Sequence, residues 1–250
     1  MTSDVFPSTH ATWIDAQLTI AEDADRAAAA GDPSAAGRAE SARDALRRHV
    51  MRRYADALAA YVSTPSVRQL AERDDLVSGF FARVLPDPGF FLRWKSSGMP
   101  LRRWLMNAMA FHCRGVARDR QRERGRSAGV DATAIEALGS GDSDAAAAFD
   151  RAWALALANE AYAQVQADLS ARGRSDDDAV FRMHVVDGRT YAQVAAATGR
   201  SEAECLNAVR RVSAALRTAV KGLLAEEGVP SSGLKAAIDE VLAIMERDHQ

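Results

Sequence analysis

Apolar side chains recur every three or four residues along most of the chain, which is the period of a helix with one buried face. Over 41–62, for example, Leu46, Val50, Tyr54, Leu58 and Tyr61 keep this spacing. The same pattern predicts further helices over 74–85, 101–124, 149–169, 180–186, 190–198, 202–224 and 234–245. The expected fold class is therefore all-α.

Composition strengthens this expectation and narrows the kind of protein. Alanine accounts for 52 of the 250 residues, and it loses no side-chain entropy in a helix, whereas β-branched residues do. No stretch of about twenty apolar residues is present to span a membrane, and the N-terminus lacks a secretory signal pattern. The two cysteines, Cys113 and Cys205, belong to no pair motif. We expect a cytoplasmic protein without a membrane segment, a disulfide framework, a metal or another cofactor.

Charge is segregated along the chain, although the net charge is only −2. Residues 46–126 hold 17 basic and 7 acidic side chains, a net charge of +10. Residues 127–180 have a net charge of −7, and residues 181–225 have a net charge of +4. Two basic segments separated by an acidic one indicate two surfaces for a polyanion, although each segment alone is also typical of a solvated helix face.

The acidic stretch 127–148 contains small residues and a Gly-Ser-Gly sequence but no sustained apolar period. These features predict a flexible acidic linker. It would join two helical domains, residues 1–126 with an N-terminal helical extension and residues 149–226. Residues 227–250 would form a C-terminal helical tail.

Residues 190–202 (TYAQVAAATGRSE) are typical of a helix-turn-helix. Gly199 supplies a residue for a turn position with positive φ, and Ser201 can cap the second helix. Cys205 and Val209 follow at helical spacing and predict the buried face of that helix. In such a motif the second helix lies in the DNA major groove, with arginines on phosphates and N-terminal side chains near base edges.

Five motifs occur in an order that is found in one known family. They are Phe6-Pro7-Ser8-Thr9 with Trp13, DDLVSGFFARVL at 74–85, LRRWL at 101–105, FDRAWA at 149–154 and the helix-turn-helix. With these motifs the chain resembles the extracytoplasmic-function (ECF) sigma factors of bacterial RNA polymerase, of the type with a long N-terminus. The resemblance implies two helical domains, sigma region two and sigma region four, in a protein that is not an enzyme.

The resemblance also implies a role for each motif. The helix over 74–85 would bind the largest-subunit clamp helices of core RNA polymerase through Asp75, Leu76, Phe80, Phe81 and Arg83. The helix over 101–124 would hold the opened minus-ten strand of promoter DNA through Arg102, Arg103, Trp104, Arg114, Arg118 and Arg122. The second helix of the helix-turn-helix would bind the minus-thirty-five duplex through Arg200, Ser201, Glu204, Asn207, Arg210 and Arg211. An anti-sigma regulator would be a further partner.

Other classes of protein are weaker alternatives. An enzyme is disfavoured because the chain has no phosphate-binding loop, no His-Glu-x-x-His pair and no Gly-x-Ser-x-Gly elbow. A helix-turn-helix transcriptional regulator would account for residues 180–224 but not for the order of the earlier motifs. The chain departs from the sigma pattern at Ser78-Gly79, Leu206 and Ala208, where glutamine or basic residues are usual. These departures keep open a divergent sigma-like protein that binds polymerase or DNA without initiating transcription.

Overall fold

The computed structural model describes residues 13–69, 72–87, 89–123, 143–227, 229, 232–233, 235–239 and 241. Every regular element within these residues is a helix, so the all-α fold class is confirmed. None of the helices described is both long enough and apolar enough to cross a membrane. The chain packs as two compact units, Met1–Trp153 with Glu226–Pro230, and Ala154–Ala225 with Ser231–Gln250.

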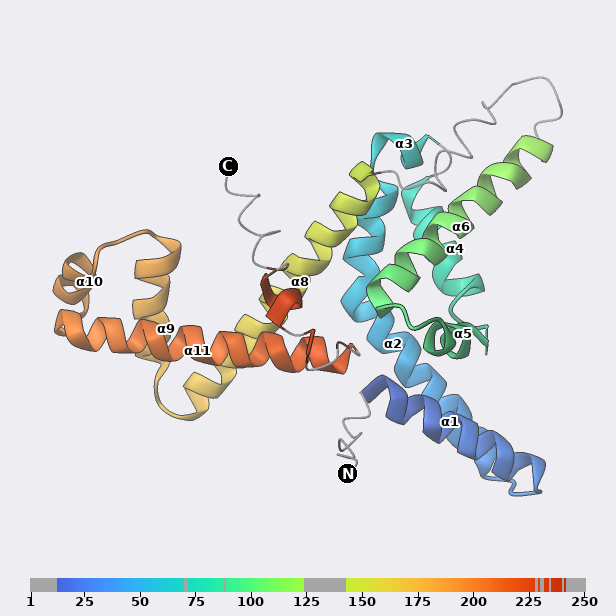
Figure 1. Cartoon of the computed structure of the whole chain (residues 1–250), viewed down its shortest axis with the longest axis horizontal. Coiled ribbons are helices and arrows are strands. Elements are labelled where there is room, and N and C mark those ends of the chain that lie inside the picture. Colours follow the sequence, from blue (N-terminus) through green and yellow to red (C-terminus); the bar gives the residue numbers. More distant parts are fainter. Residues whose placement is uncertain are drawn as a thin grey trace, which may run out of the picture. The chain divides into compact units, whose positions relative to one another are not determined.

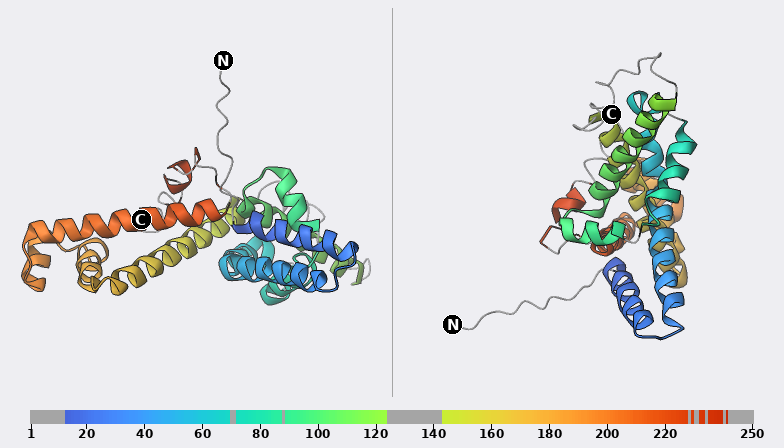
Figure 2. Two further views of the ribbon diagram at one scale, coloured as in Figure 1. Left: turned by 90° about the horizontal axis from the view of Figure 1, so that it is seen from below. Right: turned by 90° about the vertical axis from the view of Figure 1, so that its right-hand side faces the viewer.

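The first unit begins with a helical hairpin. Helices α1 (Trp13–Ala29) and α2 (Ala35–Val62) lie antiparallel and pack along their length (Figure 1; Figure 2). The buried side chains of these two helices are small in many places, and they include Ala21, Ala24, Ala35, Ala39 and Ala42. Small side chains let two helix backbones approach closely, so the alanines serve packing as well as helix propensity.

Among the described residues, four more helices and the start of a fifth belong to the first unit. They are α3 (Pro65–Arg68), α4 (Arg73–Arg83), α5 (Gly89–Ser97), α6 (Leu101–Glu123) and α8 (Ser143–Ala171) up to Trp153. Both α4 and α6 pack on α2. Tyr54 of α2, Phe80 of α4 and Leu105 and Met109 of α6 are fully buried at this junction. Pro100 immediately precedes α6, where a residue without an N–H does not interrupt the helix.

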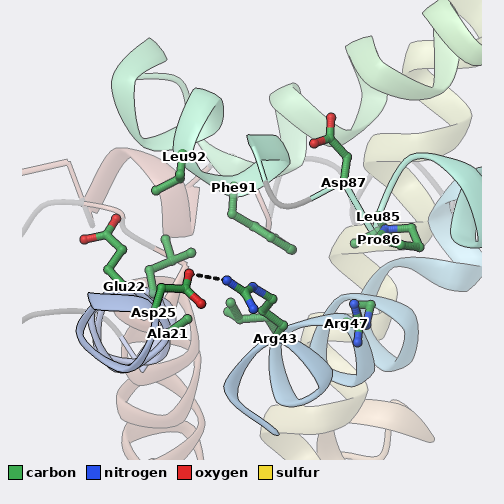
Figure 3. A pocket seen from close by; sticks show the side chains of 12 residues that line it. Ala21, Glu22, Asp25, Arg43, Arg47, Leu85, Pro86, Asp87, Phe91 and Leu92 are labelled. Atoms are coloured by element: carbon green, nitrogen blue, oxygen red, sulfur yellow. Dashed lines mark hydrogen bonds and ion pairs between the residues drawn. The ribbon is translucent and has the colours of Figure 1, made fainter. Parts of the chain in front are cut away.

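A small crevice lies where α1, α2 and α5 meet (Figure 3). Its volume is about 40 Å³, which suffices for water but is far below the several hundred Å³ of a usual ligand pocket. Arg43 of α2 donates a hydrogen bond across it to Asp25 of α1. The crevice therefore belongs to the packing of the hairpin rather than to a binding site.

Helix α8 begins inside the predicted linker 127–148, which corrects that boundary. Residues 145–148 are four alanines, which are strong helix formers, and Ala145 and Phe149 are buried in the first unit. The rest of the predicted linker, residues 127–142, lies outside the described residues. The motif at 6–9 and the tail positions 242–245 also lie outside them.

Trp153 lies in a buried polar cluster of the first unit. Its Nε1 donates a hydrogen bond to Oε1 of Glu227 (3.4 Å), and Nη1 of Arg53 lies 3.5 Å from the same oxygen. Burial raises the pKa of Glu227, and the positive charge of Arg53 opposes that shift. Because the two buried charges face each other, the fold avoids the high cost of an unpaired buried charge.

The second unit contains the rest of α8 and the helix-turn-helix. The elements that follow α8 are α9 (Ser175–Phe181) and a π-helical turn, η1 (Arg182–Val186). Helices α10 (Tyr191–Thr198) and α11 (Glu202–Glu226) then form the helix-turn-helix, and residues 235–239 are also helical. The helix predicted over 180–186 is thus the end of α9 together with η1. The core of this unit is formed by Val165, Val180, Phe181, Val194, Cys205 and Val212, among others.

Candidate nucleic-acid interface

The predicted helix-turn-helix is present as α10 and α11, which meet at Gly199 (Figure 1). A capping box starts α10, because Gln193 N donates to Thr190 Oγ1 (3.3 Å) and Thr190 N donates to Gln193 Oε1 (2.9 Å). Gly199 has a φ of 70°, a left-handed conformation that glycine adopts without steric cost, and its N–H donates to Ala195 O. Local hydrogen bonds of this kind fix where α10 begins and ends.

A second capping box starts α11 and occupies two of the predicted DNA-binding residues. Glu204 N donates to Ser201 Oγ (3.3 Å), and Ser201 N donates to Glu204 Oε2 (2.8 Å). Hydrogen bonds from the backbone and hydroxyl of Ser201 lower the pKa of Glu204. Ser201 and Glu204 therefore have a structural role in holding the first turn of α11, and a base contact by Glu204 requires its carboxylate to leave Ser201.

One buried carboxylate holds two of the predicted DNA-binding arginines. Asp177 of α9 is 4% exposed, and it accepts hydrogen bonds from Arg200 Nη1 (2.9 Å) and Arg211 Nη2 (3.0 Å). Burial alone would raise the pKa of Asp177, but the hydrogen bonds from the two arginines hold it below its usual value. Asp177, Arg200 and Arg211 are called the Asp177 cluster below. This cluster ties α9 to both α11 and the turn before it, and it orients the two guanidinium groups.

Asn207 and Arg210 are exposed on α11, and Arg210 has no ion pair within the described residues. The side of α11 that packs into the core carries Cys205, Ala208 and Val212 instead. We call Asn207 and Arg210, with the oriented Arg200 and Arg211, the recognition face; it combines side chains that bind bases with side chains that bind phosphates.

A second cationic face lies on α6, in the first unit. Arg114, Arg118 and Arg122 follow at intervals of four residues, and the last two are exposed. Phe111 is 68% exposed, and the guanidinium of Arg114 lies 4.1 Å from the centre of its ring. These four residues are called the α6 face below.

The α6 face combines the two groups that single-stranded nucleic acid requires. Cationic side chains bind the backbone, and an exposed aromatic ring stacks on a base. Phe111 is not among the site residues predicted from the sequence. Its position three residues before Arg114 and seven before Arg118 places it on the same side of the helix, and this spacing is the signal that identifies it.

The arginines at the start of α6 are engaged within the first unit. Asp150 of α8 lies 3.1 Å from Nη2 of Arg103 and 3.7 Å from Nη1 of Arg102. The guanidinium of Arg102 also lies 4.5 Å from the centre of the Trp153 ring. Asp150, Arg102 and Arg103 are called the Asp150 cluster below. Both arginines lie beside the carboxylate of Asp150, so a DNA strand would have to compete with Asp150 for them.

Trp104 packs inside the first unit and is half-buried. Its ring centre lies 5.8 Å from that of Phe90 in α5. The residues predicted to bind the minus-ten strand thus fall into two groups. Arg102, Arg103 and Trp104 are engaged by α5 and α8, whereas Arg114, Arg118 and Arg122 belong to the α6 face.

The residues predicted to bind polymerase divide in a similar way. Leu76 and Phe80 are fully buried in the first unit, which corrects their predicted role: they hold α4 in place and cannot contact a partner directly in this structure. Phe81 is half-buried, Arg83 is exposed, and Asp75 is exposed with its carboxylate 3.5 Å from the guanidinium of Arg120. Leu76 and Phe80 are four residues apart and so share the inner side of the helix.

Gly79 allows α4 to approach α6 closely. A Cβ at this position would lie 3.2 Å from Nε2 of His112, which is tighter than an ordinary contact. His112 in turn packs edge-to-face on Phe80, with ring centres 6.1 Å apart. Its burial and the positive charge of Arg83 lower its pKa. A glycine at position 79 therefore has a packing reason, the close approach of His112.

Across the described part of the chain, no group of three or more His, Cys, Asp or Glu side chains is arranged to hold a metal ion. Comparison with known protein families, with curated proteins and with solved structures found no match. The function is therefore inferred from the chemistry of the recognition face and the α6 face.

Proposed function

We propose that the chain is an alternative sigma factor of bacterial RNA polymerase, of the ECF type. In this proposal it binds core polymerase, recognises the minus-thirty-five duplex with the recognition face and holds the opened minus-ten strand with the α6 face. It acts in the cytoplasm through binding rather than catalysis, and an anti-sigma protein regulates it.

The observation that carries the proposal is the presence of two chemically different cationic faces in one chain. The recognition face belongs to a helix-turn-helix, which is suited to duplex DNA. The α6 face pairs arginines with an exposed aromatic ring, which suits an unpaired strand. A regulator that only binds duplex DNA has no need of the second face, whereas promoter opening requires both.

The Asp150 cluster favours a second candidate, a divergent sigma-like protein or helix-turn-helix regulator that does not initiate transcription. Arg102 and Arg103 are paired with Asp150, and Leu76 and Phe80 are buried. Both observations reduce the number of side chains offered to an opened strand or to polymerase. Such a protein would bind DNA or polymerase without opening a promoter.

The deciding experiment mixes the full chain with bacterial core RNA polymerase and tests for a complex by gel filtration. Transcription from a library of genomic fragments is then compared with and without the chain. Co-elution together with new, defined transcript starts supports the sigma proposal. Co-elution without transcripts supports the divergent protein, and symmetric duplex binding by the chain alone, without co-elution, supports a simple regulator.

A pair of matched variants tests the docking role of α4. Phe81→Ala should weaken co-elution with core polymerase, because Phe81 is the aromatic residue of the predicted docking set that reaches the surface. Leu92→Ala is the control, since Leu92 is an exposed apolar residue of α5 in the same unit. Equal co-elution of the two variants would contradict the assignment of α4.

A further variant tests the α6 face without polymerase. Phe111→Ala should weaken binding of a single-stranded oligonucleotide by about 1–3 kcal/mol, the usual contribution of a base stacked on an aromatic side chain. Its effect on the free energy of unfolding should be small, because the ring is largely exposed. Binding is measured by fluorescence anisotropy, with Met51→Ala as an exposed apolar control on α2. An unchanged dissociation constant would remove Phe111 from the interface.

A further inference from the structure

The second unit contains a cavity of about 480 Å³ that plays no part in the proposed DNA contacts. Side chains of α8, α9, η1 and α11 line it, and the helical residues Ile238 and Val241 add to its wall. Its other large apolar or aromatic lining residues are Tyr162, Phe181, Val185, Val186, Leu216 and Val220. A cavity of this volume and lining is in the range of small-molecule sites.

Two large apolar side chains of η1 that line the cavity are exposed to solvent. Val185 and Val186 are 53% and 69% exposed, although both are large apolar residues of a short element. They belong to η1, and π-helical turns are rare and occur frequently at functional sites. Water is poorly suited to an apolar cavity, because each water molecule needs two or more hydrogen-bonding partners.

The polar groups around the cavity define the charge of its occupant. Arg217 is exposed, lines the cavity, and has no ion pair within the described residues. The hydroxyl of Tyr162 is engaged, because it donates to Asp178 Oδ1 (2.6 Å). The remaining polar lining residues, Asn159 and Ser213, are neutral. One unpaired cation beside an apolar cavity fits a long apolar molecule with a single anionic end.

We propose that this cavity binds a fatty acid, with the alkyl chain against η1 and α11 and the carboxylate on Arg217. An apolar peptide helix would satisfy the valines but would leave the guanidinium without a counter-charge. A guanidinium is well suited to a carboxylate, because it can donate two parallel hydrogen bonds. This site does not depend on the proposed promoter binding, so failure of the polymerase experiment would leave it intact.

The test is isothermal titration calorimetry of the full chain with decanoate, dodecanoate and tetradecanoate below their micelle concentrations. The dissociation constant should fall about fourfold for each added methylene, as expected when the chain is buried. Dodecylamine, which has the same chain and the opposite charge, should bind at least tenfold more weakly than dodecanoate.

Two variants locate the site. Arg217→Gln should weaken dodecanoate about tenfold and leave dodecanol unchanged, because only the carboxylate uses the guanidinium. Lys221→Gln is the matched control, an exposed cation one turn further along α11 that does not line the cavity. Val186→Asn, an uncharged polar replacement at a position that is exposed in the folded chain, should weaken dodecanoate and dodecanol alike.

Three results would overturn the proposal. One is the absence of saturable binding by any of the three fatty acids. Another is equal affinity for dodecanoate and dodecylamine, which would assign the cavity to an uncharged apolar occupant such as a partner helix. The third is an equal effect of Arg217→Gln and Lys221→Gln, which would show nonspecific attraction to positive charge.

Discussion

The two carboxylate–arginine clusters have the same composition but different settings. In the second unit the side chain of Asp177 is 5% exposed and lies 2.9 Å from Arg200 and 3.0 Å from Arg211. In the first unit the side chain of Asp150 is 15% exposed and lies 3.1 Å from Arg103 and 3.7 Å from Arg102. The carboxylate of Asp177 is less exposed and lies closer to both of its arginines, so the Asp177 cluster should be the stronger of the two.

The clusters also differ in what they do to the proposed DNA-binding surfaces. Asp177 lies beneath the recognition face and fixes two arginines there, while Asn207 and Arg210 stay exposed. Asp150, in contrast, pairs with the arginines that a DNA strand would itself need. The same type of ion pair therefore orients arginines of the recognition face in the second unit, but in the first unit it competes with DNA for Arg102 and Arg103.

The largest effect is expected for Asp177→Asn. Loss of the carboxylate charge weakens hydrogen bonds to two arginines and should lower the free energy of unfolding of the second unit by about 2 kcal/mol. This is the lower part of the usual range, because Arg211 is half exposed. Urea unfolding of the full chain measures it, and duplex binding should weaken in parallel.

Asp176→Asn is the control for this variant. Asp176 is adjacent and lies 3.7 Å from Arg200, but its side chain is 89% exposed. Its replacement should change the free energy of unfolding by less than about 0.5 kcal/mol. If the two variants lose the same stability, the burial of Asp177 is not what matters.

Lowering the pH should also reduce the free energy of unfolding of the second unit, because Asp177 becomes protonated. The reduction should be no larger than the one expected for Asp177→Asn. Because the pKa of Asp177 is lower in the folded chain than its usual value of 3.8, folding favours its ionised form. That stabilisation is present above the usual value and is lost as the pH falls through the lower, folded-state pKa. The midpoint temperature of thermal unfolding should fall more steeply for the wild type than for Asp177→Asn as the pH is lowered from about 5 to about 2. Parallel curves would contradict this linkage.

A smaller effect on stability, and the opposite effect on DNA binding, is expected for Asp150→Asn. The first unit should lose about 1 kcal/mol, because the carboxylate of Asp150 is more exposed than that of Asp177 and lies further from its arginines. Single-stranded DNA should bind roughly fivefold more tightly at low salt, since Arg102 and Arg103 become available to phosphates. Asp168→Asn, at an exposed ion pair of α8, is the control. Weaker DNA binding by Asp150→Asn would show that Asp150 orients the arginines rather than competing for them.

The smallest effect is expected for Arg210→Ala, because Arg210 belongs to neither cluster. Duplex affinity should fall by less than about tenfold, and the slope of log affinity against log salt should become shallower by about 0.9, the value for one lost phosphate contact. The free energy of unfolding should not change. Arg172→Ala, at an exposed arginine immediately after α8, should leave both the affinity and the slope unchanged.

Local interactions explain why much of the second unit could be predicted from the sequence. The ends of α10 and the start of α11 depend on Thr190, Gly199 and Ser201, each of which acts within four residues of its own position. Hydrophobic spacing likewise located the buried side of α11 at Cys205 and Val209. Features with a range of one helical turn are visible in a sequence.

Long-range pairs explain most of what the sequence did not reveal. Asp177 meets Arg211 across 34 positions, and no spacing rule connects them. The contact between α1 and α2 was also not visible in the sequence, because many of the residues buried there are alanines, which give only a weak hydrophobic pattern. The burial of both Leu76 and Phe80 follows from helix packing on α2, which depends on which side of α4 faces inward. The sequence motif alone could not distinguish the inner side from the outer side.

The two buried cysteines have a practical consequence. Cys113 of α6 and Cys205 of α11 are both free, fully inaccessible thiols, one in each unit. Burial raises the pKa of Cys113 to about 12, which keeps it in the unreactive thiol form. An alkylating reagent can therefore modify either thiol only when its unit transiently opens. Mass-resolved labelling rates would give separate opening free energies for the two units from the natural chain, without any engineered probe.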